Sequence, residues 1–133
     1  VLPFSMNEKK FEEMFGVGAK CLHFTKVETE NDNTIVFTHH FYNMIVAGRP
    51  VFIYPTKDVT PSDLVFTDVT LSAKTVTNTN TNDGGFTFYA SYDNTDINKN
   101  DLFMNNKGSV SYWTGSSTSY PGMRSFVKNN CKN

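Results

Sequence analysis

Charged residues, cysteines and long apolar runs are all scarce in this chain of 133 residues. Neither sign of charge dominates, because 12 Lys and Arg stand against 13 Asp and Glu, for a formal net charge of −1. Proteins whose main function is to bind nucleic acid usually have a clear excess of basic residues, and electrostatic membrane anchors have a cluster of basic residues. We therefore expect neither role. The apolar runs, such as 51–54, are too short for a transmembrane helix, so we expect no membrane insertion.

Sequence patterns of catalytic and metal sites are also missing. No Gly-x-Ser-x-Gly elbow is present, and the serine-rich segment 116–119 is typical of a loop. His39 and His40 are adjacent in a predicted strand, so their side chains point to opposite faces and cannot chelate one metal together. His23 has no third ligand placed beside it by pattern. We therefore expect no enzyme, no metal and no cofactor.

The two cysteines, Cys21 and Cys131, belong neither to a Cys-x-x-Cys motif nor to a Cys/His metal pattern. One lies near the start of the chain and the other two residues before its end. We interpret them as a disulfide that ties the C-terminal segment to an early strand. In the chain-entropy treatment a loop this long would stabilise the fold by about 4–5 kcal/mol, and a disulfide would place the protein outside the cell. Two free thiols in a cytosolic protein are the alternative.

What the chain does have is aromatic residues, threonine and asparagine. Aromatics make up 14% of the chain, with 12 Phe and 6 Tyr. Aromatics and threonine favour strands, and asparagine supplies turns. From residue 19 onward the apolar residues recur with period two, which indicates short strands. We expect strands at 19–28, 34–42, 51–54, 64–71, 86–92, 102–104 and 109–114.

Helices are expected only near the two ends of the chain. Ser5–Phe15 predicts a helix in which Ser5 is the cap and Phe11, Met14 and Phe15 share one face. Gly122–Asn130 predicts a short helix that delivers Cys131 to its partner.

Turn signals join most of the strands as hairpins. The tetrapeptides Asn82–Gly85 and Asn105–Gly108 are the strongest of these signals. No repeat or linker divides the chain, so we expect one domain over 1–133. Its fold class is all-β, either an up-and-down antiparallel barrel or a β-sandwich.

Asp68 is a carboxylate inside an apolar stretch. It shares one face of the predicted strand with Leu64 and Phe66, and if that face points inward Asp68 is a buried carboxylate that needs a partner. If the other face, which begins with Val65, points inward, Asp68 lies in solvent. The sequence leaves both alternatives open.

The order of features resembles the lipocalins of tick saliva, the group that includes the histamine-binding proteins. The resemblance rests on a cysteine soon after an aromatic-glycine pair in Phe15–Leu22, on Trp113 within Ser111–Thr114, and on the closing Cys131. It implies a β-barrel, a bridge between Cys21 and Cys131, and the capture of a small host mediator.

The chain also departs from that family. The Gly-x-Trp of the first lipocalin strand and the second disulfide of many members are missing. The amine-binding members use several inward acidic residues, and Asp68 is the one candidate here. A fatty acid would need a cation near the pocket, for which Arg49 or Lys20 would have to serve.

We therefore expect a secreted, monomeric protein that sequesters a small apolar or amphipathic ligand, a lipid mediator or a biogenic amine, in a barrel cavity. The wall of that cavity would come from the rings of Phe24, Phe37, Phe41, Phe66, Phe88 and Trp113, and the polar contacts from His39, Asp68 and Tyr112. The alternative is a secreted β-sandwich module that binds a protein or glycan through the loops Tyr112–Gly122 and Thr75–Gly85.

Overall fold

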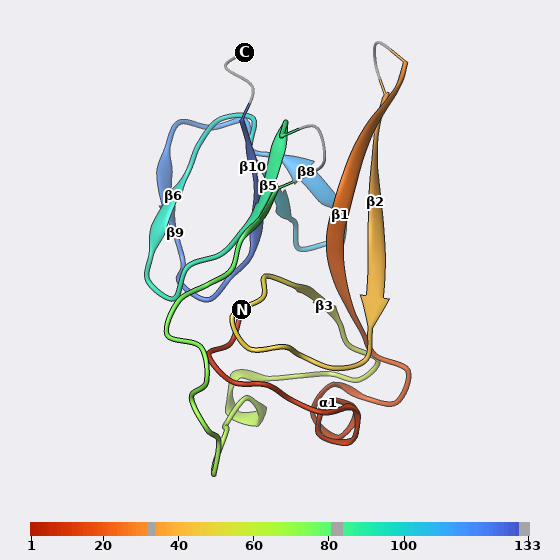
Figure 1. Cartoon of the computed structure of the whole chain (residues 1–133), viewed down its shortest axis with the longest axis vertical. Helices are drawn as coiled ribbons and strands as arrows, with labels where there is room; N and C mark the ends of the chain where they lie inside the picture. Colours follow the sequence, from red (N-terminus) through yellow and green to blue (C-terminus); the bar gives the residue numbers. More distant parts are fainter. Residues whose placement is uncertain (32–33, 81–83, 131–133) are drawn as a thin grey trace.

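The computed structural model describes residues 1–31, 34–80 and 84–130 (Figure 1). Within these ranges the protein is mostly β, as the sequence predicts, with antiparallel strand pairing throughout. The elements are α1 (Glu8–Phe15), a 3₁₀ turn (Pro61–Asp63), β1 (Lys20–Asn31), β2 (Thr34–Tyr42), β3 (Phe52–Tyr54), β4 (Thr79–Asn80), β5 (Phe86–Tyr89), β6 (Thr95–Ile97), β7 (Leu102–Met104), β8 (Val110–Tyr112), β9 (Thr118–Tyr120) and β10 (Phe126–Asn129).

Helix α1 begins later than the sequence suggests. Asn7 is the N-cap, and its side-chain oxygen accepts a hydrogen bond from the backbone N–H of Lys10 (2.9 Å). Ser5 is not the cap, because its hydroxyl instead accepts from the backbone N–H of Ala47 (3.0 Å). The predicted apolar face is confirmed, since Phe11, Met14 and Phe15 are all buried.

The first sheet has the order β2-β1-β3 and contains a long two-stranded ribbon. Strands β1 and β2 pair from Cys21 opposite Tyr42 to Asn31 opposite Thr34, whereas β3 pairs only with residues 20–22 of β1. The lower end of β1 is buried on both faces. Cys21 packs with the N-terminal helix, while Leu22 and Phe24 pack against the second sheet.

The second sheet has the order β4-β5-β10-β7-β8. Its β7–β8 hairpin, which pairs Met104 with Val110 across the predicted turn 105–108, confirms that expectation. A pairing across 82–85 also exists, but its first strand is β4, at Thr79–Asn80, and not the predicted strand at 64–71. Residues 81–83 of this connection lie outside the described residues.

The prediction of a C-terminal helix over 122–130 is wrong. Residues 126–129 form strand β10, which lies between β5 and β7. Phe126 and Val127 are both buried, and they belong to different core clusters on opposite faces of the sheet. A strand buried on both faces shows no apolar–polar alternation, which is why the period-two test missed it.

The strand predicted at 64–71 is also wrong. The segment is an irregular loop without a strand partner among the described residues, and Leu64, Val65 and Leu71 are exposed. Asp68 has a positive φ of 53°, which breaks an extended conformation.

The sheets of the described residues do not close into a barrel; they stay separate as the two sheets above and the small β6–β9 pair. The two larger sheets pack against each other through an aromatic cluster in which the ring of Phe88 lies 5.2 Å from the rings of both Phe24 and Phe52. No helix in the described part of the chain is long and apolar enough to cross a membrane.

Candidate functional site: an apolar groove ending at Arg124

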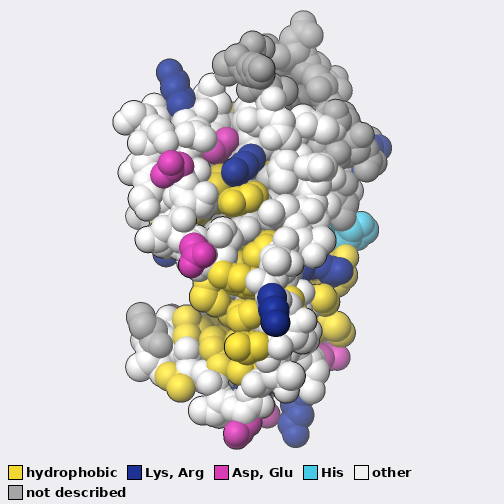
Figure 2. All heavy atoms as spheres, turned by 60° about the vertical axis from the view of Figure 1, so that its left-hand side comes forward, with side chains coloured by type: hydrophobic (Ala, Val, Ile, Leu, Met, Phe, Trp, Pro, Cys, Tyr) yellow, Lys and Arg dark blue, Asp and Glu magenta, His cyan; other side chains and the backbone are white. Residues whose placement is uncertain are grey.

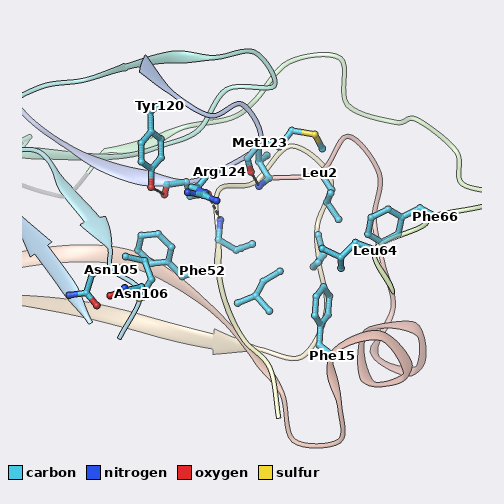
Figure 3. Close-up of a pocket in the computed structure, with 16 residues that line it drawn as sticks. Leu2, Phe15, Phe52, Leu64, Phe66, Asn105, Asn106, Tyr120, Met123 and Arg124 are labelled. Atoms are coloured by element: carbon cyan, nitrogen blue, oxygen red, sulfur yellow. Dashed lines mark hydrogen bonds between the residues drawn. The ribbon is translucent and has the colours of Figure 1, made fainter. Parts of the chain in front are cut away.

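An open cavity of about 570 Å³ lies between the N-terminal part of the chain and the second sheet. Figure 2 shows hydrophobic side chains gathered in a hollow between the upper and lower parts of the molecule. The close-up in Figure 3 shows the residues that line this cavity, which we call the Arg124 groove. Its apolar wall includes Leu2, Phe15, Ile45, Phe52, Leu64 and Phe66.

Segments far apart in sequence supply this wall. Phe15 is the last residue of α1, and Phe52 is the first residue of β3. Ile45 is held by a two-way backbone bridge with Met6, with N···O distances of 2.8 and 2.9 Å. Phe66 comes from the loop after the 3₁₀ turn, where its ring meets the ring of Phe4 edge-on at 4.9 Å. The groove is therefore a product of tertiary packing, not of one motif.

Polar groups gather at one end of the groove. Arg124 is the one charged side chain among its described lining residues, which also include Asn105 and Asn106. Val1 lines the groove as well, and burial lowers the pKa of its amino group to about 6. The Arg124 guanidinium lies 5.9 Å from the centre of the Tyr120 ring, within the range of a cation–π contact. Burial raises the pKa of Tyr120 above its ordinary value, so this phenol stays neutral and its face stays available to the cation.

A tight turn fixes the position of Arg124. The backbone N–H of Gly122 donates to the side-chain oxygen of Asn94 (2.9 Å), and that of Met123 donates to the carbonyl of Ser91 (2.6 Å). Met123 itself has a positive φ of 66°. After the turn, the hydroxyl of Ser125 accepts from the backbone N–H of Val51 (3.1 Å). Arg124 is thus anchored on both sides.

A second groove of about 450 Å³ continues from the polar end. It shares Met104, Asn105, Asn106, Tyr120 and Arg124 with the first groove. Its own lining includes Ile97, Phe103 and Trp113. The indole N–H of Trp113 donates to the carbonyl of Ser116 (2.9 Å), and the ring packs edge-on against Phe103 at 5.6 Å. The single tryptophan of the chain is therefore a built-in reporter next to Arg124.

The nine residues selected from the sequence do not converge on one cavity. Phe66 lines the Arg124 groove, and Trp113 lines the second groove. Phe24, Phe37 and Phe88 sit in ring-to-ring packing, with Phe24 5.2 Å from each of the other two. The remaining four are exposed: His39 and Phe41 on β2, Asp68 in the 64–71 loop, and Tyr112 on β8.

Sequence reasoning missed the cation that the structure places at the groove. The chain has two arginines, and the sequence argument favoured Arg49 or Lys20. The Arg49 guanidinium instead lies 5.5 Å from the centre of the Tyr42 ring, and Lys20 is exposed at the start of β1. The sequence offered one signal for this residue. Arginine is scarce, and Arg124 is one of the two arginines that could supply a guanidinium to a pocket.

Comparison of this chain with protein-family models, curated proteins and solved structures finds no match. The lipocalin resemblance therefore stays a prediction. Function has to be argued from the grooves and surfaces themselves. Among the described residues, no group of three His, Cys, Asp or Glu side chains is arranged to hold a metal ion.

Two titratable side chains are buried outside the grooves, in β1. Burial raises the pKa of the Cys21 thiol to about 12. Cys131 lies outside the described residues, so the Cys21–Cys131 disulfide also stays a prediction. Burial likewise lowers the pKa of His23, whose Nδ1–H donates to the carbonyl oxygen of Pro50 (3.0 Å). Both groups are neutral at neutral pH and stabilise the core of the fold.

Proposed function

We propose that this protein binds a small amphipathic molecule whose apolar part fills the Arg124 groove and whose anionic head meets Arg124. The observation that carries the proposal is the lining of the groove. It is mostly apolar, and among the described residues it includes one cationic side chain and no carboxylate side chain. Its volume of about 570 Å³ falls within the usual range of small-molecule sites.

The apolar part of the ligand would be stabilised by leaving water. Each Å² of apolar surface that the groove removes from solvent contributes about 25 cal/mol. Phe15, Phe52 and Phe66 offer flat ring surfaces along the wall. An apolar wall accepts alkyl and aryl groups alike. The tail would therefore determine how tightly a ligand binds more than which ligand binds.

The head of the ligand would be selected by charge. A guanidinium presents a planar fork of N–H donors that matches a carboxylate or a phosphate. Asn106 is exposed beside it and can add an amide donor. An ammonium head would instead face a like charge at this position, so the arrangement favours the lipid over the amine alternative. Asp68, the carboxylate that an amine would need, is exposed and is not among the described residues that line the groove.

Secretion and the capture of a host mediator, as the lipocalin resemblance implies, belong to this same proposal. A closed barrel is not required for it, because a groove open on one side still covers the tail of a single-chain amphiphile. The alternative of a protein- or glycan-binding module is not favoured by the groove, whose wall is apolar and concave.

The test is titration with three probes of equal chain length: dodecanoate, dodecanol and dodecylamine. Trp113 fluorescence and calorimetry would report binding. We expect dodecanoate to bind most tightly and Arg124→Gln to weaken it by about tenfold or more, the size of one lost charge-assisted hydrogen bond. Arg49→Gln is the matched control, because it removes the other arginine, which lies over Tyr42 and away from the groove.

A further variant separates the tail from the head. Phe66→Ala should weaken dodecanoate and dodecanol alike, whereas Arg124→Gln should weaken dodecanoate alone. Dodecylamine binding as tightly as dodecanoate would contradict the role of Arg124. Failure of all three probes to bind would contradict the groove as a ligand site.

A further inference from the structure

Strand β2 forms one border of the first sheet. Its nine residues pair with β1 on one side, and in the described part of the chain no strand pairs with the other side. Figure 1 shows β2 on the outer side of the ribbon, with β1 between it and the second sheet. The other border strands are much shorter, with three residues in β3, two in β4 and three in β8. In the described part of the chain, residues 23–31 of β1 also have no strand on the side away from β2, but they include Lys26, Glu28 and Glu30. Strand β2 is therefore the long border of this sheet without Lys, Arg, Asp or Glu.

None of the usual protections against edge pairing is found along β2. Natural edge strands carry lysine or proline, or a bulge that twists the edge away. Residues 34–42 read TIVFTHHFY and contain no Lys, Arg, Asp, Glu or Pro. Both register shifts of the ribbon insert their extra residue into β1, between Phe24 and Lys26 and between Thr29 and Asn31. The outer strand is thus continuous along its length.

Apolar and aromatic side chains are exposed on this strand. Phe41 is 53% exposed and Val36 is 40% exposed, and the rings of His39 and Phe41 contact each other at 4.7 Å. His39 and His40 are exposed as well. A partner that covers these side chains would remove their apolar surface from water, which favours association.

We propose that β2 pairs antiparallel with β2 of a second copy of this chain. The absence of charged side chains argues for self-pairing, because a copy of an uncharged strand brings no like-charge repulsion. A different protein selected by charge would need a charged strand here to recognise it. The pairing is isologous, with the same strand of both subunits at a two-fold axis.

The two-fold symmetry restricts the register. The axis stands perpendicular to the sheet, so paired positions must point to the same face and their numbers must add to an even sum. Centring the axis on His39 places Phe37 opposite the partner subunit's Phe41, and His39 opposite the partner subunit's His39. Aromatic pairs are among the favourable cross-strand pairs, and this register brings the exposed Phe41 beside the partner subunit's Phe37, which is partly buried. The result is a six-stranded sheet made from two sheets of three.

The first measurement is the mass of the wild type by sedimentation velocity from micromolar to several hundred micromolar. We expect twice the chain mass of 15.0 kDa at the upper end. His39→Glu and His39→Lys should each be monomeric over the same range, because either places two like charges opposite each other at the axis.

Mixing the two variants is the decisive step. His39→Glu and His39→Lys should form a heterodimer when mixed, visible by native mass spectrometry, which also shows that both variants are folded. Ser117→Glu, which adds the same charge in an exposed loop, should dimerise like the wild type. A wild type that stays monomeric overturns the proposal and leaves the β2 edge to another protein. Dimers in either single variant, or no heterodimer on mixing, overturn it too.

Discussion

The buried imidazole of His23 and the carbonyl oxygen of Pro50 are hydrogen-bonded at 3.0 Å. This bond links β1 to the segment that leads into β3, 27 residues later. A carbonyl can only accept, so Nδ1 carries the proton. Burial disfavours the imidazolium and is the largest cause of the lowered pKa of His23. The hydrogen bond to Pro50 raises this pKa in part, and the nearby Arg49 and His40 lower it. His23 is therefore a structural group whose charge state matters for folding.

The first prediction concerns acid. The unfolded chain takes up a proton on His23 as the pH falls through about 6.5, whereas the folded state resists because the folded pKa is lower. The unfolding free energy should therefore fall as the pH drops below about 6.5, until the folded pKa is passed. Urea unfolding at a series of pH values measures this. His23→Asn should show a flatter dependence than the wild type. Equal slopes in the two proteins would contradict the assignment.

The second prediction concerns Gly122, in the turn that positions Arg124. A Cβ at this position would clash with the carbonyl oxygen of Tyr92, and the next nearest atoms are backbone carbons of Tyr92 and Asp93, which cannot yield as a flexible side chain would. Gly122→Ala should lower the unfolding free energy by about 1–3 kcal/mol, the usual cost of overpacking. Gly115→Ala is the control, because its Cβ would meet only the Trp113 side chain at 3.4 Å. A thermal shift of equal size in both variants would speak against the close approach.

The third prediction concerns Asp101, a buried carboxylate. One of its oxygens accepts from the backbone N–H of Asn98 (2.8 Å), and the other accepts from that of Asn129 in β10 (2.9 Å). Asp101→Ala removes the acceptor of both bonds and should lower the unfolding free energy by about 2–3 kcal/mol. Asp101→Asn keeps one acceptor and should cost less. Asp96→Ala, which removes an exposed carboxylate, is the matched control. A similar loss of unfolding free energy in this variant would contradict the role of the two hydrogen bonds.

The fourth prediction concerns the Cys21 thiol. With a pKa of about 12, only about one thiol in ten thousand is ionised near pH 8, and the thiolate is the form that reacts. In reduced, folded protein, iodoacetamide should therefore modify at most one of the two cysteines quickly. Unfolding in guanidinium should expose the second. Mass spectrometry without reductant separately tests the predicted disulfide, because a bonded pair stays unmodified even when unfolded. Fast double labelling of the folded, reduced protein would contradict the burial of Cys21.

Local chemistry made part of the fold predictable. The β7–β8 hairpin follows from a four-residue turn segment, Asn105–Gly108, between two short strands. The helix at Glu8–Phe15 follows from the spacing of Phe11, Met14 and Phe15. Each of these signals spans fewer than about a dozen consecutive residues, so each could be recognised from the sequence without knowing the tertiary structure.

Tertiary context decided the rest. Residues 126–129 form a strand between two neighbouring strands, β5 and β7, whereas 64–71 is an irregular loop interrupted by the positive φ of Asp68. The Arg124 groove depends on residues as distant as Leu2, Phe66 and Arg124, whose meeting no sequence period encodes. The alternation along a strand predicts which face a side chain is on. It does not predict which distant segment packs against that face.

The double burial of the lower end of β1 affects how this gene can vary. Cys21, Leu22, His23 and Phe24 are all buried, two on each side of the strand. In a saturation mutagenesis screen for folded protein, these codons should form an unbroken block of low tolerance. Strand β2, which is exposed at Val36 and at 38–41, should accept many replacements in the same screen. Neighbouring strands of one ribbon would thus differ sharply in the replacements that leave the protein folded.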